Sequence, residues 1–245
     1  MNEDTKGVLH PLTILAEESY KVFTDLGFEV ATGPEIETGW YCFDSLNFPK
    51  EHPARDMQDA FWIKNEDEKV LRTHTTTVSV KKLEEMAKNG QTEGAYISIG
   101  KVFRNESTDA THEMQFYQID GVIVGENINL ANMKGVLIEF YKKVLGENTE
   151  IEFRPSFFPF TEPSVEVHAK FNGLPASAKG SGEARWLEMM GGGMLHPNVL
   201  KNAGLDPEKI QGFAFGGGLD RIAMIRWNIP DVRLFYQGDL RLNQF

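Results

Sequence analysis

The spacing of hydrophobic residues along the chain predicts four helices. Residues 10–27 and 129–146 carry apolar side chains at helical intervals, and a glycine ends each run. The second run is the clearest, since one face would carry Leu130, Met133, Leu137, Phe140 and Val144. Residues 75–90, which also end at a glycine, and residues 219–228 complete the set.

Other segments alternate hydrophobic and polar residues and predict strands. They cover residues 28–31, 60–63, 95–104, 114–125, 151–155, 164–171, 185–194 and 212–218. Residues 33–59 are rich in Gly, Pro, Asn and Asp and predict a long ordered loop with short elements. Because strands follow one another with helices at the edges, the pattern predicts an α+β fold: an antiparallel, mixed-edge sheet flanked by helices.

Composition narrows the class of protein. The 245 residues fit one large domain better than two small ones, and the net charge of -11 argues against a free-standing nucleic-acid binder. Cys42 is the single cysteine, so an intramolecular disulfide and a cysteine-based zinc site are excluded, and we expect its thiol to be packed. The sequence has no signal peptide and no apolar run near the roughly 18 residues of a membrane span, so we expect a cytoplasmic protein without membrane contact.

Common nucleotide-binding motifs are missing from the sequence. It contains neither a GxxxxGK[ST] phosphate loop nor a GxGxxG fingerprint after a first strand. HExxH is also missing, and the six histidines lack metal-ligand spacing. A nucleotide enzyme with this sequence would therefore hold phosphates with side chains.

The stretch "KVFRNESTDATHEMQFYQIDG" joins two predicted strands by a long polar loop. Arg104 ends the first strand, where a guanidinium is well placed to grip a phosphate. Glu106 would point to the same face if the strand continued, and His112 lies across the loop. The returning strand presents Phe116, Gln118 and Asp120 at a period of two. The alternative is a solvated sheet face with an incidental ion pair.

Two further stretches suggest a ligand site. In "GFAFGGGLDRIAM", a strand runs into glycines and then a helix that carries Arg221, an arrangement that lets an anion lie against backbone. In "RPSFFPFTEPSVEV", prolines hold three phenylalanines and Glu162 between two strands, which suits a preformed aromatic pocket. The alternatives are a flexible turn for the first stretch and a hydrophobic corner for the second.

Together these stretches resemble the catalytic domain of bacterial phenylalanyl-tRNA synthetase alpha chains, a family of class II aminoacyl-tRNA synthetases. The resemblance runs from about residue 10 to residue 245 and includes "ATGPEIE", "FDSLNFPKEHPARDMQDAFW", "LRTHTT" and "WLEMMGGGMLHPNVL". It implies one catalytic domain over residues 1–245, without the family's N-terminal coiled-coil arm. It also implies activation of L-phenylalanine by ATP to phenylalanyl-adenylate, followed by transfer to tRNA(Phe).

The resemblance implies roles for individual residues. Arg104, His112 and Arg221 would be catalytic. ATP would be bound by Arg104, Glu106, His112, Phe116, Gly218 and Arg221. The amino acid would be bound by His74, Thr76, Gln118, Asp120, Phe158, Phe160 and Ala214. Glu162 would be a Mg²⁺ ligand, and Glu188 is a weaker candidate for the same role.

Partners and departures follow from the same resemblance. The family implies a beta subunit and homodimer contacts through the catalytic domain. Most of the tRNA-binding surface would lie outside this acidic chain. Asp120 and Asp220 stand where the family usually has Glu, which shortens each carboxylate by one methylene. Two other interpretations stay open: a catalytically reduced synthetase-like binding or regulatory module, and an unrelated ATP-dependent ligase on the same fold.

Overall fold

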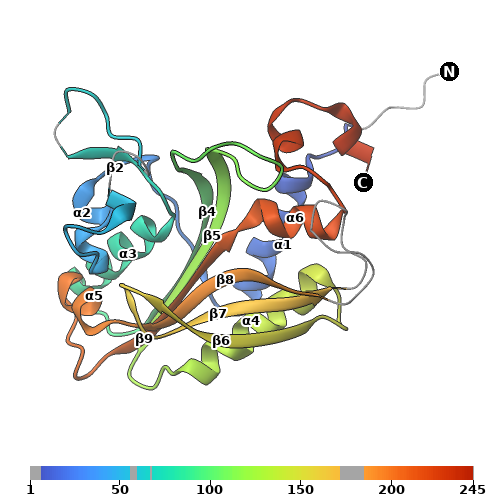
Figure 1. Cartoon of the computed structure of the whole chain (residues 1–245). Coiled ribbons are helices and arrows are strands. Elements are labelled where there is room, and N and C mark those ends of the chain that lie inside the picture. The colour runs from blue at the N-terminus through green and yellow to red at the C-terminus, as the bar shows by residue number, and fades with distance from the viewer. Residues whose placement is uncertain (1–6, 56–59, 67, 172–184, 245) are drawn as a thin grey trace.

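A seven-stranded sheet forms the centre of the computed structural model, which describes residues 7–55, 60–66, 68–171 and 185–244 (Figure 1). From edge to edge its strands are β1 (Glu29–Val30), β4 (Gly94–Phe103), β5 (Gln115–Gly125), β9 (Gln211–Gly218), β8 (Arg185–Leu195), β7 (Thr161–Phe171) and β6 (Glu150–Phe158). Strand β1 runs parallel to β4, and the other neighbours pair antiparallel. The predicted α+β fold with a mixed-edge sheet is therefore confirmed.

Helices and a small second sheet surround the central sheet. The α-helices are α1 (Pro11–Asp25), α2 (Gly39–Cys42), α3 (Thr76–Lys88), α4 (Leu130–Leu145), α5 (Pro197–Asn202) and α6 (Leu219–Arg226). The 3-10 helices are η1 (Asp44–Leu46), η2 (Pro53–Arg55), η3 (Val232–Tyr236) and η4 (Leu240–Gln244). The second sheet pairs β2 (Ile36–Thr38) with β3 (Lys69–Leu71). Within the described ranges, no helix combines the length and apolarity needed to cross a bilayer.

The larger hydrophobic core lies between the sheet and helices α1, α4 and α6, which cover one face (Figure 1). Phe23 of α1 stacks on Phe140 of α4 at 4.8 Å and on Phe215 of β9 at 5.4 Å between ring centroids. These rings are almost inaccessible to solvent, and burial of three such side chains stabilises the fold by several kcal/mol. The face of β9 that carries Phe215 is thereby fixed toward the helices.

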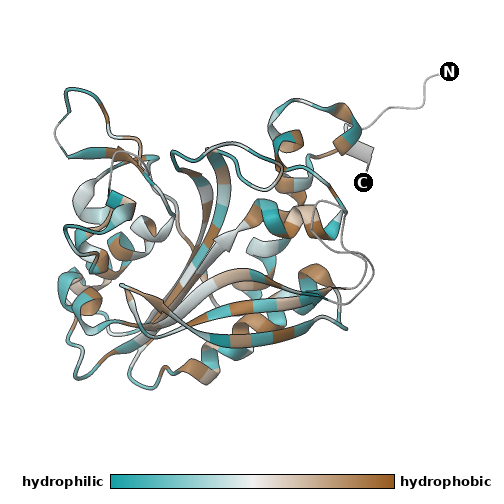
Figure 2. Cartoon of the chain, in the orientation of Figure 1, coloured by the Kyte–Doolittle hydropathy of each residue, from teal (hydrophilic) through white to brown (hydrophobic). Residues whose placement is uncertain are grey.

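The opposite face of the sheet is more polar. On β7, Val165 and Val167 enter the core, so the alternating residues Glu166 and His168 point away from it. Figure 2 shows this alternation of hydrophilic and hydrophobic residues along β6 and β7. A second core, built mainly from α3 and α5 against the ends of β5 and β9, covers part of this face. Two cavities lie on this side of the sheet.

Several segment predictions need correction. Residues 60–63 do not form a strand: Trp62 makes only an isolated bridge to Val70. The two strands around the proline-rich stretch are longer than predicted and meet in a tight hairpin at residues 159–160. Residues 36–38, 69–71 and 197–202 form short elements that the periodicity did not reveal, because three to six residues carry too little pattern. Residues 56–59 of the predicted loop lie outside the described residues.

Candidate active site

Two adjoining cavities lie on the polar side of the sheet. We name the first, of about 600 Å³, the aromatic cavity, because Phe48, Phe158 and Phe160 line it. We name the second, of about 680 Å³, the arginine cavity, because Arg104, Arg185 and Arg221 line it. The residues common to both are Arg104, Glu106, Gln118, Glu188, Gly191 and Gly216. Two molecules bound side by side would therefore meet at the Arg104 guanidinium.

The candidate residues fall into these cavities by predicted role. The aromatic cavity contains His74, Thr76, Gln118, Asp120, Phe158, Phe160 and Ala214. The arginine cavity contains Arg104, Glu106, His112, Phe116, Gly218 and Arg221. Glu162 lines neither cavity. The structure thus brings together the two candidate binding sets, which come from segments more than 100 residues apart.

The wall of the aromatic cavity is a row of rings. Phe158 and Phe160, at the end of β6 and in the hairpin turn, have centroids 5.7 Å apart and near-parallel planes. Phe48, from the loop after η1, lies 5.7 Å from Phe160 and stacks at 6.3 Å on His74. An alanine Cβ at Gly191 would lie 2.6 Å from Cζ of Phe158, so that ring occupies space that only glycine leaves. The cavity fits a flat, apolar group.

Polar groups at the base of the aromatic cavity centre on Asp120. Its carboxylate accepts hydrogen bonds from Thr76 Oγ1 at 2.7 Å and Ser79 Oγ at 2.8 Å, both on α3. Burial raises the pKa of Asp120 to about 7, although the two hydroxyls oppose this shift. The backbone N–H of Thr75 donates to Gln118 Oε1 at 3.2 Å and thereby orients the Gln118 amide. These groups suit a cationic amine that would pair with Asp120.

His74 lines the same cavity with its ring held in one orientation. Its Nε2–H donates to the Cys42 carbonyl at 2.8 Å, so Nδ1 carries a lone pair. Nδ1 is buried and has no hydrogen-bond partner among the described residues. Burial lowers the pKa of His74 to about 4, so the ring is neutral at pH 7. The Cys42 thiol is packed as predicted, and burial raises its pKa to about 12.

Arg104 lies at the junction of the cavities and is positioned by backbone and ring contacts. Its Nε donates to the Thr73 carbonyl at 3.2 Å, and its guanidinium carbon lies 5.2 Å from the Phe116 ring centroid. The strand does not continue as far as Glu106: β4 ends at Phe103, and the Glu106 N–H turns back to donate to the Arg104 carbonyl at 2.8 Å. The Glu106 carboxylate still reaches within 3.9 Å of the Arg104 guanidinium.

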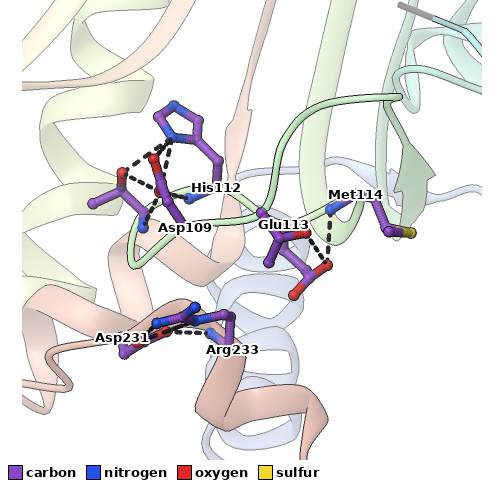
Figure 3. Close-up of polar contacts among 8 residues, drawn as sticks. Asp109, His112, Glu113, Met114, Asp231 and Arg233 are labelled. Carbon is purple, nitrogen blue, oxygen red and sulfur yellow. Dashed lines mark hydrogen bonds and ion pairs between the residues drawn. The ribbon is translucent and has the colours of Figure 1, made fainter.

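His112 lies on the exposed loop that borders the arginine cavity (Figure 3). Its Nδ1–H donates to both carboxylate oxygens of Asp109, each at 3.1 Å. Asp109 also accepts the backbone N–H groups of Thr111 at 2.7 Å and His112 at 2.8 Å. These hydrogen bonds lower the pKa of Asp109, whose ionised carboxylate holds the tip of the loop together.

On the far side of the arginine cavity, α6 begins directly after the glycines of β9 and presents Arg221 in its first turn. Asp220 beside it is buried and accepts the Tyr117 backbone N–H at 2.8 Å and the Tyr236 hydroxyl. Burial raises the pKa of Asp220 to about 6. This carboxylate therefore joins α6, β5 and η3, a role that its position in the sequence did not reveal.

The carboxylates differ in how well they are placed for a metal ion. Glu162 is 73% exposed and pairs with His196 Nε2 at 3.4 Å, away from both cavities. Glu188 borders both cavities beside Glu106. Among the residues that the structure describes, no group of three or more Asp, Glu, His and Cys side chains is arranged to hold a metal. A magnesium ion in the arginine cavity would need phosphate oxygens as its main ligands.

Comparison with known proteins identifies the family. The model of the tRNA synthetases class II core domain (F) matches residues 1–245. The phenylalanine–tRNA ligase alpha subunit of Bacillus pumilus (strain SAFR-032) is 50% identical over 242 residues, which cover 97% of this chain and 68% of the relative. That of Bacillus subtilis (strain 168) is 49% identical over 244 residues, 98% of this chain and 69% of the relative. The chain belongs to the phenylalanine–tRNA ligase alpha-subunit family.

The fold of this family member is also found in a solved structure. Pyrrolysyl-tRNA synthetase from Desulfitobacterium hafniense superposes with a TM-score of 0.71, over 94% of this chain and 74% of that chain. The sequences are only 19% identical, so this likeness concerns the fold alone. The α+β class and the family resemblance drawn from the sequence are confirmed.

Some residues of the site in this alpha subunit were not candidates from the sequence. Phe48 completes the ring wall, Ser79 is the second hydroxyl on Asp120, and Arg185 adds a third arginine. Phe48 falls inside a quoted signature, and Ser79 follows Thr76 by three positions on a helix, which puts both on one face. Those two signals were available in the sequence. Arg185 begins β8, an interior strand of the sheet, and carries no comparable signal.

Proposed function

We propose that this chain binds L-phenylalanine in the aromatic cavity and ATP in the arginine cavity and joins them into phenylalanyl-adenylate. One observation carries the proposal: the two cavities share a wall that contains Arg104 and Gln118. The substrate carboxylate and the α-phosphorus of ATP would meet at that wall. The names of the relatives, phenylalanine–tRNA ligase alpha subunits, support phenylalanine as the amino acid.

The phenylalanine ring would lie among Phe48, Phe158 and Phe160, while the ammonium group would face Asp120. Edge-to-face or offset ring contacts contribute roughly 0.5–1.5 kcal/mol per pair beyond area burial. The neutral His74 ring does not repel a cation, and Asp120 supplies the opposite charge when it is ionised. Ala214, which is 4% exposed, limits the depth of the cavity.

In the proposed reaction, a carboxylate oxygen of phenylalanine attacks the α-phosphorus of ATP. A bond forms between this carboxylate oxygen and the α-phosphorus. The bond from the α-phosphorus to the oxygen that bridges to the β-phosphate breaks, and pyrophosphate leaves. Arg104 would stabilise the charge that builds on the α-phosphate, and Arg221 and His112 would bind the outer phosphates. Glu106 would accept from the adenine amino group, Phe116 would stack on the ring, and Gly218 would give it room.

Aminoacyl-tRNA synthetases generally use ATP and Mg²⁺. The donor set here fits a magnesium ion that arrives with ATP, because Glu188 and Glu106 border the junction and phosphates complete the shell. When bound, the ion would neutralise phosphate charge. Glu162, the ligand expected from the resemblance, lies outside both cavities, so Glu188 is the better-placed carboxylate for the nucleotide site.

Transfer to tRNA(Phe) would follow, with a beta subunit as the partner that the name "alpha subunit" of the relatives implies. We also propose homodimer contacts. Val30 lies on the edge strand β1 and is 47% exposed, and Leu26 at the end of α1 is 39% exposed. A second copy of the chain would cover these exposed apolar side chains. Light scattering after size exclusion would measure the mass.

Phenylalanine-dependent exchange of pyrophosphate into ATP tests the proposal on the isolated chain and with a beta subunit added. We expect exchange with phenylalanine, and a loss of about 10²–10³-fold in Arg104→Ala, the size typical for one lost charge-stabilising group. No exchange under either condition would favour the binding-module interpretation. Exchange with another acid but not phenylalanine would favour an unrelated ligase.

A further inference from the structure

The loop over the arginine cavity is held by a segment from near the end of the described chain. We name residues 105–113 the loop and residues 231–236, which include η3, the clip. The backbone N–H of Val232 donates to the carbonyl of Ala110, at the tip of the loop, at 3.0 Å. Figure 3 shows Asp231 and Arg233 of the clip directly beside the part of the loop that carries Asp109 and His112. The clip therefore touches the loop near the middle of its sequence.

The clip is itself fixed to the core of the protein. Val232 and Phe235 are 3% and 7% exposed and belong to the larger hydrophobic core. The Tyr236 hydroxyl donates to Asp220, and the same carboxylate accepts the Tyr117 N–H at 2.8 Å. A continuous set of contacts thus joins β5 and α6 to the tip of the loop through the clip.

Charged groups of the clip and of the loop also act on one another. Arg233 pairs with Asp231 within the clip, with Nε to Oδ1 at 2.9 Å. The loop carboxylates Asp109 and Glu113 also act on Arg233 and contribute to its raised pKa, after the larger effect of Asp231. Asp231 of the same pair is repelled by Asp109, so the charges of the clip offset one another, and the hydrogen bond from Val232 to Ala110 carries the contact.

Both partners line the arginine cavity. Thr111, His112 and Glu113 from the loop form part of its wall, and Val232 from the clip forms another part. A nucleotide that uses His112 needs this loop in a defined place, because each misplaced contact lowers the binding energy. We propose that the clip positions the loop for nucleotide binding, with the Val232 amide and the Tyr236 hydroxyl as its positioning groups. The inference rests on the proposed use of this cavity for ATP.

Val232→Pro tests the role of the Val232 backbone N–H. Asp231 has φ -146° and ψ 121°, the extended backbone that a residue before proline adopts, and Val232 opens a 3-10 helix, where proline is tolerated. Val232→Pro removes the N–H, whereas Val232→Ala trims the side chain and keeps it. We expect Val232→Pro to raise the KM for ATP about fivefold over Val232→Ala, with the KM for phenylalanine equal in the two.

Hydrogen–deuterium exchange without substrate gives a second measurement. We expect amides of residues 105–113 to exchange faster in Val232→Pro than in Val232→Ala, with no difference in β7. Equal KM for ATP and equal loop exchange in the two variants would overturn the proposal. Hydrogen–deuterium exchange needs no turnover, so it tests the clip even if the unaltered chain shows no pyrophosphate exchange. Absence of pyrophosphate exchange in the unaltered chain would count against the proposed function and not against the clip.

Tyr236→Phe tests whether the Tyr236 hydroxyl holds the clip to Asp220. This test does not depend on whether Val232→Pro folds. Tyr236→Phe removes the hydroxyl that donates to Asp220 and keeps the ring. Tyr41→Phe is a matched control, since the Tyr41 hydroxyl donates to the Glu84 carboxylate at 3.0 Å outside both cavities. We expect a severalfold rise in the KM for ATP and faster loop exchange in Tyr236→Phe alone. The same effects in both variants, or in neither, would refute the anchoring role.

Discussion

Phenylalanine binding should weaken as the pH falls below 7, because Asp120 must ionise to pair with an ammonium group. The structure buries this carboxylate and raises its pKa to about 7. With that pKa, about one Asp120 in eleven is ionised at pH 6 and about ten in eleven at pH 8. Since the apparent Kd scales inversely with the competent fraction, it should fall about tenfold between pH 6 and pH 8.

Equilibrium binding of phenylalanine, measured by calorimetry from pH 5.5 to 8.5, checks this prediction. Asp120→Asn should bind more weakly and lose the pH dependence, because an amide does not titrate in this range. Ser79→Ala removes one hydroxyl that stabilises the ionised form, so its profile should move to higher pH. A flat profile in the unaltered protein, or an unchanged tenfold slope in Asp120→Asn, would refute the reasoning.

The same group makes a prediction about stability without substrate. Folding raises the pKa of Asp120 from 3.8 to about 7, so the folded state binds the proton more tightly than the unfolded state. Its contribution to the free energy of unfolding is complete below pH 4 and is lost as the pH rises through 7. The loss amounts to about 4 kcal/mol at 1.36 kcal/mol per pKa unit. Urea titrations of the unaltered protein and Asp120→Asn at pH 4 and pH 8 should reveal this difference.

Three other predictions concern the pocket and the core. Ala214→Gly should deepen the aromatic cavity and allow adenylate formation with para-chlorophenylalanine; an unchanged preference would contradict the placement of Ala214. Gly191→Ala puts a Cβ 2.6 Å from Phe158 Cζ, so the KM for phenylalanine should rise at least about tenfold in pyrophosphate exchange. Tyr141→Phe should raise the free energy of unfolding by about 1 kcal/mol in urea titrations, because the Tyr141 hydroxyl is buried without a hydrogen-bond partner among the described residues. A destabilised Tyr141→Phe would mean that the hydroxyl has a partner.

The structure shows how Asp120 and Asp220, which stand where the family usually has Glu, fit their surroundings. Asp120 fits against Gly216, where an added Cβ would lie 2.7 Å from its Oδ2, so little room is left for a longer side chain. Asp220 reaches both the Tyr117 amide and the Tyr236 hydroxyl with its shorter carboxylate. We therefore expect that having Asp in place of Glu does not weaken the contacts at either position.

The local pattern of the sequence determined the long elements. Apolar residues at helical spacing fixed α1 and α4, and alternation fixed the strands that form the sheet, because burial of one face requires those periods. The motif resemblance also determined the family and the identities of the candidate residues. The short helix α5 was missed, and residues 60–63 were wrongly predicted as a strand. In both cases the segment is too short to show a reliable hydrophobic period.

Only the tertiary structure decided which groups meet. The pairing of Gln118 with Gly218 across β5 and β9 brings the loop beside α6, and no local pattern encodes a register over 100 residues of chain. Burial of Asp120, the isolation of Glu162 from both cavities and the contact between Val232 and Ala110 likewise depend on what packs around each group. A pKa or a cavity belongs to an environment, and distant segments supply that environment when the chain folds.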